Sequence, residues 1–115
     1  MAKKVISSTY PASDTVFNVA NVIAKNATLS GLSDKVAVIE VGGKGKDRQY
    51  TYAELNLRVN RLANALRRAG VRKGERVFVL LPNRIEILDA LLACLKTGAI
   101  YTPANFRLSA EEIRF

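Results

Sequence analysis

Apolar residues recur every three or four positions in the middle of the chain, which is the spacing of one face of an α-helix. The positions of this stripe are Leu55, Val59, Leu62, Leu66 and Ala69. Thr51 and Glu54 precede it as a capping box, because each side chain can bond the other residue's backbone N–H. Gly70 supplies a left-handed stop at the far end. We expect a helix between these signals.

The other faces of this expected helix are polar and rich in arginine. They carry Arg58, Asn60, Arg61, Asn64, Arg67 and Arg68. Basic residues near the end of a helix suit the negative end of its dipole. The simplest interpretation of the arginine-rich face is a solvated surface.

The last third of the chain alternates apolar runs with short turns. Residues 76–81 form a nearly continuous apolar run, as expected of a parallel strand covered on both faces. Residues 85–97 are apolar on most of their surface and predict a largely buried helix, opened by a capping box over residues 83–86. Gly98 ends this helix, and residues 99–102 predict a second strand. Strand, helix and strand with such short links predict a right-handed βαβ unit.

The first half of the chain predicts an arm, a helix and a hairpin. Residues 1–15 are expected to form an irregular arm, and Asp14 or Thr15 to cap a helix from about Val16 to Lys25. Residues 26–35 are rich in loop-forming residues. Two runs of strand character, 36–41 and 48–51, flank the glycine-rich segment 42–46, which is a hairpin pattern.

The glycines of segment 42–46 also fit a phosphate-binding loop. Such a loop must open a helix and carry Ser or Thr after its lysine. This segment leads into Asp47, Arg48 and more strand. We therefore interpret it as a hairpin turn.

The final residues predict the start of another helix. Ser109 and Glu112 form a third capping box, and Phe115 follows within the first turns. A helix so short is unstable alone, and two parallel strands leave open edges and uncovered apolar surface. We expect an α/β fold: a partial N-terminal subdomain with a β-hairpin and a βαβ unit, incomplete without the rest of the parent domain. Apolar surface near Leu91 and Val79 should then be exposed and should favour self-association.

The composition of the chain argues against several classes of binding and catalytic function within these residues. Eighteen Lys and Arg face ten Asp and Glu, a formal charge of +8, but the charges are spread out, so nucleic-acid binding is not expected. Without histidine, zinc sites and histidine-assisted Ser or Cys catalysis are excluded within these residues. Cys94, the only cysteine, predicts a buried, inert thiol.

The sequence carries no targeting signal that we recognise. No apolar run is long enough to span a membrane and no secretory pattern is present, so we expect the protein to be in the cytoplasm.

Several of these pieces recur together in one known family. They are residues 50–55, 60–66, 70–77, 80–83, Glu86, 95–105 and 108–113. In this order and spacing, the stretch from Tyr50 to Phe115 resembles the AMP-forming acyl-CoA synthetases of the adenylate-forming superfamily. The resemblance implies that residues 16–115 are the start of the large N-terminal AMP-binding domain, truncated here.

The resemblance implies a two-step reaction in the parent protein. A carboxylic acid attacks the α-phosphate of ATP, giving an acyl-adenylate and pyrophosphate, and coenzyme A then displaces AMP. The family uses ATP, magnesium and coenzyme A, but its phosphate loop and its catalytic residues lie beyond this chain. The resemblance therefore assigns no catalytic residue and no metal ligand here. It implies an inactive fragment that binds none of these cofactors tightly.

One residue is a candidate for ligand binding. Residues 104–107 lie where some acyl-CoA synthetases contact the nucleotide end of coenzyme A, and such a position matches the rim of a parallel sheet. Arg107 can pair with a phosphate there. The alternative interpretation is an exposed arginine in a loop before a helix. A different class of function is also open, a stand-alone dimerising or interaction module derived from the family.

Overall fold

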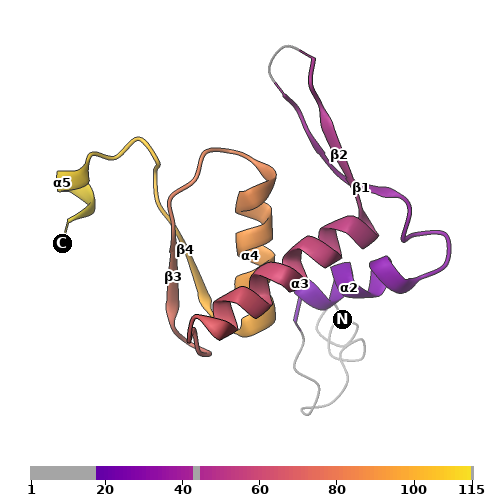
Figure 1. The fold of residues 1–115 in the computed structure, drawn as a ribbon, viewed down its shortest axis with the longest axis horizontal. Helices are drawn as coiled ribbons and strands as arrows, with labels where there is room; N and C mark the ends of the chain where they lie inside the picture. The colour runs from indigo at the N-terminus through magenta and orange to yellow at the C-terminus, as the bar shows by residue number, and fades with distance from the viewer. Residues whose placement is uncertain (1–17, 43–44, 115) are drawn as a thin grey trace, which may run out of the picture.

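The computed structural model describes residues 18–42 and 45–114. Its elements are α2 (Ala20–Thr28), β1 (Val36–Glu40), β2 (Arg48–Thr51), α3 (Tyr52–Arg68), β3 (Arg76–Val79), α4 (Ile85–Thr97), β4 (Ile100–Pro103) and α5 (Ala110–Ile113). Helices α2, α3 and α4 gather at the centre, the β1–β2 hairpin projects from one side, and the β3–β4 pair lies on the other (Figure 1). The predicted α/β class is confirmed. The arm over residues 1–15 lies outside the described residues.

Helix α2 begins and ends later than the sequence pattern predicts. The predicted caps Asp14 and Thr15 lie outside the described residues, and the helix continues past Lys25 to Thr28. The Asn18 side chain accepts a hydrogen bond from the backbone N–H of Ala20 at 3.0 Å. The same side chain donates to the carbonyl oxygen of Leu95 at 2.6 Å. Asn18 therefore ties the start of α2 to the end of α4.

The hairpin prediction is confirmed. Strands β1 and β2 are antiparallel, with Val36 opposite Thr51 and Glu40 opposite Arg48, and the register shifts between Val36 and Val38. The glycine-rich segment joins two strands and opens no helix. That arrangement supports a turn rather than a phosphate-binding loop.

Helix α3 follows the hairpin directly, and its capping box is present as predicted. The backbone N–H of Glu54 donates to Thr51 Oγ at 3.2 Å, and the N–H of Thr51 donates to Glu54 Oε2 at 2.8 Å. Gly70 adopts a φ of 92° just beyond the helix, as expected of a left-handed stop. Ala63 is buried while Ala69, the C-cap, is exposed. The buried face of α3 therefore includes Ala63 and does not extend to the predicted Ala69.

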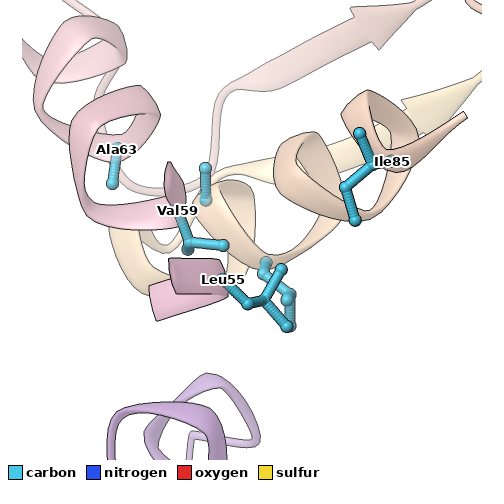
Figure 2. Packing of buried hydrophobic residues seen from close by; sticks show 6 residues of the cluster. Leu55, Val59, Ala63 and Ile85 are labelled. Carbon is cyan, nitrogen blue, oxygen red and sulfur yellow. The ribbon is translucent and has the colours of Figure 1, made fainter. Parts of the chain in front are cut away.

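The core lies where α3 crosses α4 (Figure 2). Its buried members are Leu55, Val59, Ala63, Ile85, Leu92 and Ala93. Burying a Val, Leu or Ile side chain contributes about 1.5–3 kcal/mol relative to exposure. The hairpin leads directly into α3, and the β3–β4 pair flanks α4 in the chain. The contact between α3 and α4 therefore fixes these two pairs of strands relative to each other.

Strand β3, helix α4 and strand β4 form the predicted parallel unit. Arg76 lies opposite Ile100 and Val79 opposite Pro103. Gly98 ends α4 with a φ of 76°, and a Cβ there would lie 2.9 Å from Lys73 Cγ. A side chain at this position would therefore meet both backbone strain and a steric contact.

Two details of this unit differ from the predictions. The capping box over residues 83–86 is wrong, because Arg84 is the N-cap and makes no side-chain cap bond. Coverage of the strand at residues 76–81 on both faces is also wrong, since Phe78 is 56% exposed. The predicted exposure of apolar surface near Val79 is confirmed, because Phe78, Leu80 and Leu81 are exposed although Val79 itself is buried. The predicted exposure near Leu91 is only partial, because Leu91 is half-buried.

Helix α5 is a short final turn. Its predicted capping box is confirmed, because the N–H of Glu112 donates to Ser109 Oγ at 3.3 Å and the N–H of Ser109 donates to Glu112 Oε2 at 2.8 Å. No helix within the described ranges combines the length and the apolar character needed to cross a membrane.

Candidate functional site

The turn between β4 and α5 lies at the carboxyl ends of the two parallel strands. Val79 and Pro103 are opposite each other at these ends, and the backbone N–H of Ala104 donates to the carbonyl oxygen of Val79 at 2.9 Å. The strands therefore hold the first residue of the turn directly. In open α/β sheets this edge is the usual position for a ligand.

Arg107 lies on this turn with an exposed side chain. Asn105 shapes the turn, since its side-chain oxygen accepts from the N–H of Arg107 at 3.0 Å and its carbonyl oxygen accepts from the N–H of Leu108 at 3.1 Å. The guanidinium of Arg107 lies over the Phe106 ring, 5.6 Å from its centre. None of the ion pairs within residues 18–42 and 45–114 includes Arg107. The guanidinium thus faces solvent at the strand ends, the position that the sequence analysis predicts.

A second group of polar side chains lies between α3 and α4. Arg58 binds the carboxylate of Asp89 through two nitrogens, with Nη2 2.6 Å and Nε 3.1 Å from Oδ2. Asp89 is only 5% exposed. The guanidinium also lies 5.0 Å from the centre of the Tyr50 ring. The hydrogen bonds to Asp89 are the main cause that raises the pKa of Arg58 above its ordinary value.

This ion pair lies along a groove of about 750 Å³. Its polar lining residues are Arg58, Arg61, Glu86 and Asp89, and its other lining residues are apolar. Its apolar lining residues are Leu62, Ala65, Phe78, Val79, Leu80, Leu81 and Ala90. The sequence analysis placed Arg58 on a solvated surface and missed its partner. The available signal was Asp89 itself, an acidic residue inside an otherwise apolar helix pattern.

Glu40 connects the hairpin to α4. Its carboxylate pairs with Arg48 at 2.6 Å and accepts a hydrogen bond from the backbone N–H of Ile85 at 3.1 Å. The hydrogen bond from Arg48, then that from Ile85, lowers the pKa of Glu40 below its ordinary value. Glu40 therefore supplies the helix cap that the sequence analysis assigned to residues 83–86.

The remaining reactive group is the thiol of Cys94. The side chain is fully buried, as predicted, and burial raises the pKa of the thiol above its ordinary value. A thiol that is both buried and harder to ionise is a poor nucleophile. Within the described part of the chain, no three His, Cys, Asp or Glu side chains are grouped to hold a metal ion.

Comparison with known proteins places this scaffold in a family. A sequence profile described as "AMP-binding enzyme" matches residues 25–115. The feruloyl-CoA synthase of an Amycolatopsis species is 56% identical over 63 residues, which cover 55% of this chain and 13% of that protein. The acetyl-coenzyme A synthetase of Pasteurella multocida is 42% identical over 82 residues, which cover 71% of this chain and 13% of that protein.

The fold is shared with solved structures of the same kind. A fatty acyl CoA synthetase from Mycobacterium tuberculosis matches with a TM-score of 0.65 and 31% identity, over 84% of this chain and 18% of that one. The chain spans about 13% of the length of the two curated relatives above. The profile match, the sequence identity and the shared fold agree, and the chain belongs to the family of AMP-binding enzymes.

Proposed function

We propose that this chain is part of an ATP-dependent acid–thiol ligase. The overall reaction joins a carboxylic acid to coenzyme A and converts ATP to AMP and pyrophosphate. The observation that carries this proposal is the 56% identity over 63 residues to a protein named for feruloyl-CoA synthesis. The acetyl-coenzyme A synthetase, similar over a longer stretch, supports the same acceptor. Both relatives form a thioester of coenzyme A by name.

In this proposal the chain contributes framework rather than reacting groups. Residues 16–115 form the start of the large AMP-binding domain and follow an arm over residues 1–15. The residues that match the family pattern form helix caps, helix stops and the parallel strand pair. We propose that the chain alone is inactive, because the phosphate loop and the catalytic residues come from the rest of the parent protein.

The proposal places the metal and most of the nucleotide site outside this chain. Magnesium, when bound, spreads the charge of the ATP phosphates during adenylate formation. The described ranges hold no group of three acidic side chains that could bind the ion, so in this proposal its ligands come from other residues.

Arg107 is the one residue of this chain for which we propose contact with a cofactor. Its exposed guanidinium at the strand ends can pair with a phosphate of the coenzyme A nucleotide. The guanidinium lies over the Phe106 ring, 5.6 Å from its centre, which allows a cation–π contact. The proposed step for Arg107 is binding in the second half-reaction, after the adenylate has formed.

The test compares the whole parent protein with the 115-residue chain. Each is assayed for exchange of pyrophosphate into ATP with acetate, with ferulate and with a long-chain fatty acid. We expect exchange by the parent with one class of acid, none by the chain alone, and consumption of coenzyme A in the second step. Exchange by the isolated chain, or a parent that forms adenylate but no thioester, would contradict the proposal.

A second candidate function is a stand-alone dimerising module. The exposed apolar side chains of Phe78, Leu80, Leu81 and Ile100 favour it, because they would be covered in a self-associated form. The same exposed surface is expected if the parent's remaining strands normally cover it. Activity of the parent in the exchange assay separates the two candidates.

A further inference from the structure

A polar pocket lies where α2, α3 and α4 meet, apart from the strand ends. It has a volume of about 330 Å³, within the range of about 300–1,000 Å³ that is usual for ligand sites. The polar residues that line it are Asn18, Asn21, Asn60, Asn64, Arg67 and Lys96. We call it the Lys96 pocket. It contains two cationic side chains and no carboxylate.

Lys96 is held in this pocket by neutral partners. Its ammonium donates to Asn56 Oδ1 at 2.8 Å and to Asn60 Oδ1 at 2.6 Å. No ion pair among the described residues includes Lys96 or Arg67. Burial lowers the pKa of Lys96 below its ordinary value, as expected of a half-buried ammonium without a counter-charge. The amide oxygens of Asn56 and Asn60 therefore solvate the charge on Lys96, and no carboxylate among the described residues compensates it.

The amides around Lys96 are oriented by this contact. An asparagine that accepts through Oδ1 has two N–H groups left to donate. Asn60 is such a residue, and it lines the pocket. For Asn21, Asn64 and Arg67, the described parts of the chain supply no side-chain hydrogen-bond partner. The pocket therefore gathers cationic and amide donors from three helices, and the side-chain acceptors that line it are neutral amide oxygens.

We propose that the Lys96 pocket binds a small phosphate-bearing molecule, with the Lys96 ammonium and the Arg67 guanidinium as counter-charges and the asparagine amides as donors. Two positive charges surrounded by amide donors match a doubly charged group with several oxygens. A monovalent carboxylate has only two oxygens and compensates only one of the two charges. This site is separate from the proposed role of Arg107, which lies on the turn after β4.

The first test titrates the 115-residue chain with inorganic phosphate and follows the side-chain amide signals of Asn60 and Asn64 by NMR. Ionic strength is held constant with sodium chloride, and acetate is titrated in parallel. We expect saturable shifts with phosphate and smaller, unsaturated shifts with acetate. Equal responses to phosphate, acetate and chloride would overturn the proposal.

Variants then test the two cations. Lys96→Met and Arg67→Gln should each weaken phosphate binding by about tenfold, the effect of one charged hydrogen-bond partner. Arg68→Gln is the matched control, because Arg68 is exposed on the same helix and does not line the pocket. Arg67 is also exposed, so its variant should remain folded even if Lys96→Met does not. Equal affinity for the Arg67 and Arg68 variants would overturn the proposal.

A further titration with AMP identifies the source of the phosphate group. Affinity for AMP equal to or above that for inorganic phosphate would support a phosphorylated metabolite as ligand. Weaker binding of AMP would support free phosphate. Loss of both responses in the double variant Lys96→Met/Arg67→Gln is expected in either case, and retention of either response would place the ion elsewhere.

Discussion

The carboxylate of Glu40 accepts a hydrogen bond from the backbone N–H of Ile85, 3.1 Å away, although 45 positions separate the two residues. This bond joins the end of β1 beside the hairpin turn to the first turn of α4. A negative charge near a helix N-terminus is favourable, because it meets the free N–H groups and the positive end of the dipole.

Glu40→Gln should lower the stability of the chain, and the loss should depend on pH. The folded protein holds the pKa of Glu40 below its ordinary value of 4.5. The ionised carboxylate therefore stabilises the fold above pH 4.5, and this contribution is lost as the pH falls through the lowered pKa. Thermal melts of wild type and variant at pH 7 should differ, and the difference should shrink toward zero in strong acid.

Glu111→Gln is the control for this experiment, because Glu111 is exposed near the N-terminus of the short helix α5. Its melting temperature should stay close to that of the wild type. A gap between wild type and Glu40→Gln that is equal at all pH values would contradict the role of the carboxylate charge.

Asp89→Asn should destabilise the contact between α3 and α4. It removes the charge that binds both nitrogens of Arg58 and leaves a half-buried guanidinium with a weaker partner. Hydrogen bonds to charged groups contribute about 1.5–3 kcal/mol, and the partial exposure of Arg58 favours the lower end. Urea unfolding measures the change.

A double-mutant cycle with Arg58→Met separates the pair from its surroundings. The two substitutions together should cost less than the sum of the single substitutions. Strict additivity would show that Arg58 and Asp89 do not stabilise each other.

Arg107→Ala in the whole parent protein should raise the KM for coenzyme A and leave adenylate formation nearly unchanged. The reason is that the proposed contact forms only with the coenzyme A nucleotide, which enters after the adenylate. Pyrophosphate exchange and thioester formation are measured on the same preparation. Arg114→Ala, another exposed arginine close by, is the matched control. An unchanged KM for coenzyme A would contradict the proposed contact between Arg107 and coenzyme A.

Phe78→Lys should shift the 115-residue chain toward the monomer. Phe78 is 56% exposed on β3 and lies beside other exposed apolar residues, so self-association is the expected way to cover it. Light scattering over a concentration series measures the mass. Val22→Lys, a change at an exposed valine on α2, tests whether added charge alone has the same effect. A monodisperse wild-type monomer would contradict the expectation.

Much of the local structure was predictable from short segments of sequence. The capping boxes at Thr51 and Ser109 and the stops at Gly70 and Gly98 were correct, because each signal and its partner lie within a few residues. The end of α2 was misplaced, because the helix continues through residues of loop-like composition to Thr28, whose hydroxyl donates to the carbonyl oxygen of Lys25 at 2.9 Å. For the candidate site, the position of Arg107 at the strand ends was predicted, but its role stays a proposal.

The pairings between distant elements were decided by the tertiary structure alone. Glu40 with Ile85, Arg58 with Asp89 and Lys96 with Asn60 are separated by 45, 31 and 36 positions. Helix caps determine where an element begins and ends, and apolar periodicity determines which of its faces is apolar. Both signals depend only on residues that are neighbours in the chain. Which polar groups meet depends on how α3, α4 and the hairpin pack, and that packing sets the rotation of each helix about its axis.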